Sequence, residues 1–245
     1  MNVTAYLLCA GFGTRMGEAT KSCPKPMLDI NGKPLLEYTL RHLKSLGVSN
    51  VVINLHYLAK AFTEYFSDGS ALGLNITYLH EPAPTGTAGG VLRMHELAGN
   101  PTDHLLVIYG DILTDLDYRE FMKFHHSHSG LASMVVHQRH KSNSYVEMDQ
   151  SGKVVRFLER PKNNPANASG EPYWVNSAIY CISPETLGYI QKNEISDWPK
   201  DIFPHLVKEG NLYAYKLGEA HRVAIDTGER LELARSEINH YNFNF

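Results

Sequence analysis

Cysteine is scarce in this sequence of 245 residues, and its placement does not suit cross-linking. Cys9, Cys23 and Cys181 form no Cys-x-x-Cys pair and leave an odd count, which argues against a disulfide framework and against a zinc site. Cys9 and Cys181 stand in apolar, strand-like segments that are typical of small core residues. Cys23 lies beside a cationic loop that could lower its pKa and make it reactive, but an inert thiol is the favoured interpretation.

The sequence also lacks a long apolar run, a secretory leader and an excess of positive charge. No apolar stretch approaches the roughly 18 residues of a membrane span, and the N-terminus carries neither a charged segment nor a cleavage site of small residues. Lysine and arginine number 23 against 26 acidic residues, for a net charge of −3. We therefore expect a cytoplasmic protein with no membrane partner and no nucleic-acid partner.

Apolar residues make up 43% of the chain, enough for a substantial buried core. The length fits a single domain over residues 1–245, in which 1–130 and 131–245 form two halves of different character. No segment repeats with a period of about 20 to 50 residues, which excludes a solenoid.

The first half alternates apolar, strand-like runs with helical patterns. Strands are expected at 3–8, 51–55, 75–80 and 105–109, and helices at 34–46, 57–66 and 91–97. This alternation predicts an α/β fold with a Rossmann-like, mostly parallel central sheet flanked by helices.

The second half has a mixed pattern of expected strands and helices. Strands are expected at 135–137, 146–158 with a turn at Ser151 and Gly152, 174–182, 212–217 and 223–225, and helices at 184–190, 200–208 and 229–240. A polar loop spans 162–170. We expect this half to close over the first.

The segment from Leu8 to Pro26 follows the first strand and has the residue types of an anion-binding loop. Gly11 and Gly13 allow backbone N–H groups to turn toward one anion, and Arg15 and Lys25 add fixed positive charge. The dinucleotide fingerprint G-x-G-x-x-G fails because the next glycine, Gly17, comes one residue too late, and no P-loop is present. A plain turn after the strand is the alternative interpretation.

Three further features are expected at the same edge of the sheet, because ligands of open α/β sheets bind beyond the carboxyl ends of strands. The stretch 85–90 is a second glycine-rich turn, and Asp111 and Asp226 each follow an apolar strand. One or two carboxylates together with substrate phosphates are the usual ligands of Mg²⁺. Either aspartate alone could instead cap a turn or a helix.

His125, His126 and His128 cluster at the end of an expected helix. The spacing of His125 and His128 could suit a metal, but no cysteine and no third ligand stands near them in the sequence. A solvated helix end is the favoured interpretation.

The loop at Leu8–Pro26 resembles the signature of sugar-1-phosphate nucleotidylyltransferases, commonly Leu-Ala-Gly-Gly-x-Gly-Thr-Arg-Leu followed by Pro-Lys-Pro. This chain departs from the signature at Cys9 and Ala10, which are small, and keeps both charges. Glu159-Arg160-Pro161 is similar to the family's Glu-Lys-Pro, with arginine for lysine, and the run from Val175 to Tyr180 is similar to its Asn-Ala-Gly-Ile-Tyr. The resemblance implies a GT-A-like nucleotidyltransferase fold, in which 1–130 mainly bind the nucleotide and 131–245 mainly bind the sugar phosphate.

The resemblance also implies a role for each matching residue. Arg15 and Lys25 would be catalytic, and Asp111 and Asp226 would bind Mg²⁺ as the cofactor. The nucleotide would be bound by Leu8, Ala10, Gly11, Gly13, Thr14, Gly86, Thr87, Ala88 and Gly89, with backbone groups of 85–90 reading the base. The sugar phosphate would be bound by Tyr109, Gly110, Glu159, Arg160 and Asn176. Because arginine and lysine are not interchangeable at bidentate sites, Arg160 is the weakest assignment.

The expected partners are an NTP and a sugar 1-phosphate. The short chain and its Gly-Thr-Ala-Gly-Gly stretch resemble the mannose- and heptose-1-phosphate guanylyltransferases, which favours GTP. Uridylyl-, thymidylyl- and muramate-type members share these traits, so UTP, dTTP or CTP with another sugar phosphate stays open, as does a regulatory paralogue that binds nucleotide sugars without turnover. A nicotinamide enzyme is disfavoured by the failed fingerprint. The strands of the second half and the C-terminal helices could pair in a homo-oligomer.

Overall fold

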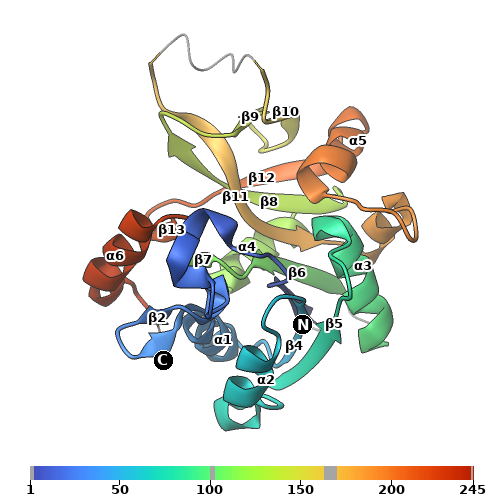
Figure 1. The fold of residues 1–245 in the computed structure, drawn as a ribbon. Coiled ribbons are helices and arrows are strands. Elements are labelled where there is room, and N and C mark those ends of the chain that lie inside the picture. The colour runs from blue at the N-terminus through green and yellow to red at the C-terminus, as the bar shows by residue number, and fades with distance from the viewer. Residues whose placement is uncertain (1–2, 100–102, 163–169, 244) are drawn as a thin grey trace.

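The first strand of the chain lies inside a seven-stranded sheet with the order β12-β8-β11-β6-β1-β4-β5 in the computed structural model, which describes residues 3–99, 103–162, 170–243 and 245 (Figure 1). The strands of this sheet are β1 (Val3–Leu8), β4 (Asn50–Leu55), β5 (Asn75–His80), β6 (His104–Tyr109), β8 (Ala132–Arg139), β11 (Tyr173–Ile182) and β12 (Leu212–Lys216). Four of the six pairings are parallel, and only β11 runs against its two neighbours. The expected mostly parallel sheet is therefore confirmed.

Six further strands form small two-stranded ladders. These are β2 (Asp29–Ile30) with β3 (Lys33–Pro34), β7 (Ile112–Thr114) with β13 (Arg222–Ala224), and β9 (Ser144–Met148) with β10 (Val154–Glu159). The β9–β10 hairpin rises beyond the sheet at one end of the molecule (Figure 1). It corresponds to the expected strand pair with a turn at Ser151 and Gly152.

Helices cover both faces of the sheet, because α1 to α5 bury apolar side chains against it. The α-helices are α1 (Leu35–Ser45), α2 (Lys60–Phe66), α3 (Gly86–Ala98), α4 (Tyr118–His126), α5 (Phe203–Lys208) and α6 (Gly228–Glu237). Shorter turns of 3-10 helix are η1 (Thr14–Thr20), η2 (Lys25–Met27), η3 (Ser70–Leu72), η5 (Pro184–Tyr189) and η7 (Ile238–His240), and η6 (Trp198–Ile202) is a π-helix. No helix among the described residues has the length and apolar character needed to cross a membrane.

Two large apolar clusters hold the layers together. Side chains of α1, α2 and α4 pack with the sheet in one cluster, and those of α3, η6 and α5 pack with it in the other. Leu36, Leu40 and Leu43, spaced as a helix requires, are fully buried under α1. A third cluster joins α6 and the ladder of β7 and β13 to the N-terminal loop. Residues 131–245 thus contribute β8, β11 and β12 to the same sheet, while the β9–β10 hairpin and the β13–β7 ladder lie outside it.

Several expected boundaries were wrong. The helix expected at 57–66 begins only at Lys60, and the last helix divides into α6 and η7. The stretch 85–90, expected as a flexible turn, forms the first turn of α3, which begins at Gly86. Most of the polar loop expected at 162–170 lies outside the described residues, at 163–169.

Candidate functional site

Four parallel strands, β1, β4, β5 and β6, end at the same edge of the sheet, and a cavity of about 490 Å³ opens there. Eleven of the residues assigned by resemblance line it: Leu8, Ala10, Gly11, Gly13, Thr14, Arg15, Lys25, Gly86, Thr87, Tyr109 and Asp111. The expected convergence of the two glycine-rich stretches and Asp111 is therefore confirmed as geometry. Gly110 does not line the cavity, and a Cβ added to it would lie 2.4 Å from the sulfur of Cys9.

The loop after β1 has the open backbone that an anion requires. Gly13 takes φ = 66°, in the left-handed region, and directly precedes η1, whose first turn carries Arg15. The hydroxyl of Thr20 donates to the carbonyl of Gly13 at 3.0 Å and fixes this bend. A Cβ on Gly11 would meet no atom within 4 Å, so space is left for a ligand beside that residue.

Lys25 is the most enclosed cation of the cavity. The residue is only 8% exposed, and its Nζ lies 3.0 Å from Asp111 Oδ2. Burial of an ammonium group is tolerated when a carboxylate compensates the lost hydration. The ion pair therefore fixes one positive and one negative group at the base of the cavity.

Asp226 lies beside Asp111, because the N–H of Ile225 donates to the carbonyl of Asp111 at 2.9 Å and β13 pairs with β7. Arg15 and Arg230 each place a nitrogen 3.3 Å from its carboxylate. Its Oδ1, which faces Arg230 Nε, is buried and has no hydrogen-bond partner among the described residues. Two adjacent carboxylates, one with an oxygen that lacks a hydrogen bond, fit a hard divalent cation such as Mg²⁺.

Of the residues assigned to the sugar phosphate, Tyr109 lines the cavity, whereas Glu159, Arg160 and Asn176 lie on neighbouring elements and do not line it. Asn176 donates from Nδ2 to the hydroxyl of Tyr180 at 2.9 Å, and the Tyr180 ring packs edge-on against Tyr109 with centroids 5.9 Å apart. Glu159, at the end of β10, has a pKa raised by burial, which the nearby cations Arg160 and Lys200 partly oppose. These contacts connect the assigned sugar residues to the cavity through Tyr109.

Backbone donors at the start of α3 are already used within the protein. The N–H groups of Ala88 and Gly89 donate to the carbonyl of Ser196 at 2.8 and 3.1 Å, and that of Thr87 donates to Asp197 Oδ1 at 3.0 Å. Burial raises the pKa of Asp197, but the hydrogen bonds from Thr87 and the charge of Lys200 outweigh it, and the net pKa lies below the usual range. The segment 196–197 thus caps α3 and seats Gly86 and Thr87 at the cavity.

Sequence reasoning missed two polar residues that line the cavity. Asn54 accepts from the N–H of Cys9 at 2.8 Å and donates to Glu81 Oε2 at 2.7 Å. Glu81, which is 3% exposed, also accepts from the hydroxyl of Thr85 at 2.6 Å. Both residues stand at strand ends, Asn54 in β4 and Glu81 directly after β5. That position is the feature of the sequence by which they could have been found.

A second cavity of about 310 Å³ lies behind Asp226 and is rich in arginine. Arg139, Arg222 and Arg230 line it, and burial lowers the pKa of Arg222 to about 10, although Asp111 opposes the shift. Arg222 donates to the carbonyl of Ser177 at 3.1 Å. These arginines strengthen the positive potential around both candidate metal ligands.

The structure contradicts one expectation for the histidine cluster and agrees with the expectations for the cysteines. The expectation of a solvated helix end was wrong for His125, which is 2% exposed, with Nδ1 2.9 Å from Ser133 Oγ. Cys9 and Cys181 are buried core residues as expected. Burial raises the pKa of Cys23, in agreement with the favoured inert thiol.

Sequence comparison shows which family model matches the chain and which known proteins are similar to it. The profile of the family described as nucleotidyl transferase matches residues 4–230. A probable mannose-1-phosphate guanylyltransferase 1 from Oryza sativa subsp. japonica is 33% identical over 218 residues, which cover 87% of this chain and 58% of that protein. A UTP–glucose-1-phosphate uridylyltransferase from Synechocystis sp. is 32% identical over 219 residues, covering 84% and 55%. The chain spans little more than half the length of these curated relatives.

Solved structures share the whole fold. HddC from Yersinia pseudotuberculosis, in complex with GMP-PN, superposes with a TM-score of 0.78 at 21% identity, covering 96% of this chain and 99% of that one. A putative glucose-1-phosphate thymidylyltransferase from Bacillus anthracis, in complex with a sucrose, gives a TM-score of 0.82 at 18% identity, covering 99% and 98%. At these identities the likeness establishes the fold.

Proposed function

Because the chain belongs to the nucleotidyl transferase family, we propose that it transfers the nucleotidyl group of an NTP to a sugar 1-phosphate and releases pyrophosphate. The observation that carries this proposal is the meeting of the Gly11–Gly13 loop with the Lys25–Asp111 ion pair in one cavity at the carboxyl ends of the strands. The continuous sheet supports a single catalytic domain over 1–245, with the nucleotide mainly at 1–130 and the sugar phosphate mainly at 131–245.

The reaction requires little covalent chemistry from the side chains of the protein. An oxygen of the sugar 1-phosphate attacks the α-phosphorus and forms a P–O bond, while the bond from the α-phosphorus to the bridging oxygen breaks and its electron pair leaves with pyrophosphate. Positioning and charge stabilisation are then the main catalytic contributions. Backbone N–H groups of Gly11 and Gly13 and the Arg15 side chain hold the departing β- and γ-phosphates, and Lys25 bridges the α-phosphate and the acceptor.

We assign Asp111 and Asp226 as the ligands of Mg²⁺. The bound cation supplies charge neutralisation on the phosphate oxygens. Lys25, whose Nζ lies 3.0 Å from Asp111, would place its positive charge toward the phosphates beside these ligands. The two aspartates are held in place for this role by Lys25, Arg15 and Arg230.

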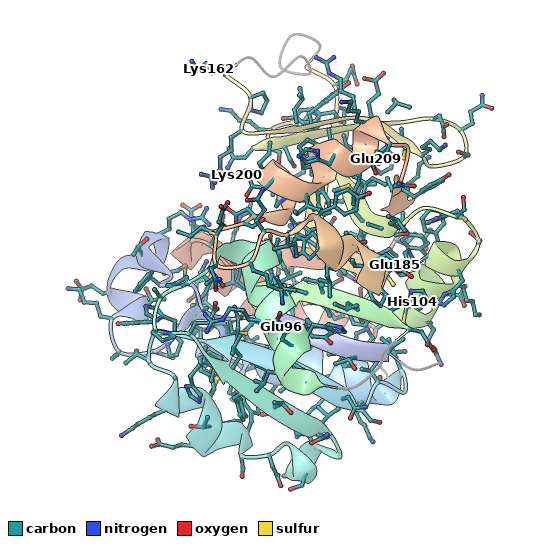
Figure 2. The ribbon with its side chains drawn as sticks, turned by 90° about the vertical axis from the view of Figure 1, so that its right-hand side faces the viewer. Glu96, His104, Lys162, Glu185, Lys200 and Glu209 are labelled. Atoms are coloured by element: carbon teal, nitrogen blue, oxygen red, sulfur yellow. The ribbon has the colours of Figure 1, made fainter. Side chains whose placement is uncertain are left out.

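For the acceptor, we assign Glu159 and Asn176 to the sugar hydroxyls and Arg160 to its phosphate. Glu159 is largely buried, whereas the Arg160 side chain is 68% exposed and can turn toward a ligand. Lys200, which acts electrostatically on Glu159, is a second cation in this region, exposed at the surface (Figure 2).

The choice of GTP rests on the similarity to guanylyltransferases. Glu81 lies in the wall of the nucleotide cavity, but its side chain is fully buried, its carboxylate already accepts from Asn54 and Thr85, and Oε1 lies 3.7 Å from Arg93. Glu81 therefore stabilises the cavity wall. The guanylyltransferase from Oryza sativa is consistent with this choice, and mannose or heptose 1-phosphate is the acceptor we propose with it.

The proposal is tested by measuring pyrophosphate release with GTP, UTP, dTTP and CTP against a panel of sugar 1-phosphates that includes mannose, glucose, muramate-type and heptose substrates. We expect the highest kcat/KM with GTP, and loss of activity in EDTA that Mg²⁺ restores. Release that resists EDTA would contradict the metal assignment. Absence of release with every pair, together with tight nucleotide-sugar binding by calorimetry, would identify a silent binding paralogue instead.

A further inference from the structure

We propose that His104, His125 and Cys181 bind a Zn²⁺ ion. His104 opens β6, His125 lies in the last turn of α4 and Cys181 lies in β11, so residues up to 77 positions apart in sequence are brought together. The ligating atoms of all three side chains lie within 4.8 Å of one another. Two imidazoles and a thiolate form a donor set that suits Zn²⁺ and does not suit Mg²⁺.

The sheet explains why the three side chains meet. Cys181 pairs with Leu106 in the β11–β6 ladder, and His104 stands two residues before Leu106, so their side chains emerge on the same face. That face is the one covered by α4, whose Tyr118, Phe121 and Met122 belong to the same apolar cluster as Cys181. The last turn of α4 then brings His125 over the pair. The site lies at the amino end of β6, about 17 Å along the strand from the cavity.

Surrounding hydroxyl groups hold His125 in the manner of a zinc ligand. The N–H of Gly130 donates to His128 Nδ1 at 3.1 Å, so the proton of His128 is on Nε2, which donates to Ser133 Oγ at 2.8 Å. Ser133 Oγ also lies 2.9 Å from His125 Nδ1 and can accept a hydrogen bond from it. The lone pair of His125 is then on Nε2, whose contact with Ser183 Oγ is long, at 3.3 Å. Zinc-binding imidazoles are typically oriented by such a hydrogen bond from the other ring nitrogen.

Solvent can reach the site from one side. Cys181 is fully buried and His125 nearly so, but His104 is only partly buried and lies at the margin of the molecule, where Glu185 acts on it electrostatically (Figure 2). Three protein ligands leave one tetrahedral position for water. Coordination replaces the S–H bond of Cys181 with a Zn–S bond and releases the thiol proton to solvent.

The competing explanation is that the three side chains have a structural role without metal. Titration with Co²⁺ distinguishes these two explanations. The full chain is freed of metal by chelation and titrated with Co²⁺ in excess Mg²⁺, which occupies carboxylate sites. We expect saturation at one equivalent, with a near-ultraviolet thiolate-to-cobalt charge-transfer band and the visible bands of tetrahedral Co²⁺. Zn²⁺ should abolish both sets of bands by displacement and should raise the Tm.

Matched variants locate the site. Cys181→Ser should lose the charge-transfer band, whereas Cys9→Ser, which alters an equally buried thiol in another place, should retain it. His104→Gln alters a partly exposed ligand and should weaken Zn²⁺ binding by at least about tenfold, which keeps the proposal testable if Cys181→Ser fails to fold. Absence of the band in the parent chain, or its persistence in Cys181→Ser, would overturn the proposal.

Discussion

Lys25 is central to the electrostatics of the cavity. The residue is only 8% exposed, so its ammonium group requires a negative charge to compensate the lost hydration, and Asp111 at 3.0 Å provides it. The same aspartate is our proposed metal ligand, so one carboxylate serves two cations. Phosphate oxygens of a bound NTP would restore the balance of charge, and this is the physical reason for a buried lysine at this position.

Replacing Lys25 by methionine keeps most of the side-chain volume and removes the charge. We expect kcat for nucleotidyl transfer to fall by about 10² to 10³, because a preorganised charge that stabilises the transition state is lost. Steady-state kinetics with GTP and the best acceptor measure the effect. Lys21→Met is the control, because Lys21 lies on the same loop and is paired with Glu18 in solvent. Equal losses in both variants would argue against a specific role for Lys25.

At this scale, the sequence was most informative where a residue type has a direct chemical use. Arg15, Lys25 and Asp111 could be predicted because cations and carboxylates after strands suit phosphate and metal, and the structure places all three at one cavity. Glu81 could not be singled out, because its burial depends on Asn54, 27 residues earlier, and on Thr85. His104 and Cys181 could not be linked to His125, because strand pairing and the position of α4 bring them together.

Among the loops, the segment after β1 and the start of α3 use glycine for different reasons. A Cβ on Gly11 would meet no protein atom within 4 Å, so a larger residue there is excluded only by a ligand. Gly86 takes φ = 82°, and a Cβ there would lie 2.4 Å from the carbonyl oxygen of Ser196. The first glycine leaves space for binding, and the second is required by the fold.

Gly11→Ala is therefore expected to separate binding from stability. We expect an unchanged or slightly higher Tm, because alanine restricts the unfolded chain, and a KM for the NTP raised by at least about tenfold. Thermal unfolding and initial rates measure the two effects. Gly86→Ala should instead lower the Tm, and Gly188→Ala, at a site with no atom within 4 Å, should have the same small effect on the Tm as Gly11→Ala and leave the KM unchanged. A normal KM in Gly11→Ala would remove that loop position from the nucleotide site.

The start of α3 shows the limit of sequence reasoning for elements. Glycine-rich sequence predicts a loop, because glycine has low helix propensity. The helix nevertheless begins at Gly86, because Ser196 and Asp197, more than 100 residues later, accept hydrogen bonds from its first N–H groups. The strands β1, β4, β5 and β6 and the helix α1, whose apolar patterns are local, were predicted closely, whereas the short strands β2, β3 and β7 were not predicted.

Over the whole molecule, the reversed strand β11 is the feature that the pattern of alternating strands and helices does not contain. It lies between β6 and β8 and joins the second half of the chain to the sheet of the first. Between Asn176 and Tyr180 its pairing with β8 shifts register, and Ala178 there has φ = 60°. Local sequence gives the period of a strand but not its partner, so the pairing of β8, β11 and β12 with the sheet of the first half could not be predicted.

Neutral, enclosed histidines make the stability of the molecule depend on pH. Burial, aided by Arg222, Arg139 and Arg230, lowers the pKa of His137 to about 3, and burial also lowers the pKa of His42. In the unfolded chain these groups titrate near 6.5. Between pH 6.5 and 3 the unfolded state therefore binds more protons than the folded state, and the free energy of unfolding falls as the pH falls.

Urea unfolding in EDTA at pH 7 and pH 5 measures this dependence. One pKa unit corresponds to about 1.36 kcal/mol, so His137 alone contributes up to about 2 kcal/mol of the loss at pH 5. His137→Gln should reduce the difference between the two pH values even if it lowers stability at both, because it removes the titrating ring and keeps a polar group facing Ser177 Oγ. His240→Gln, which alters an exposed histidine, should leave the difference unchanged. An identical pH difference in His137→Gln and the parent chain would show that His137 is not held neutral by the fold.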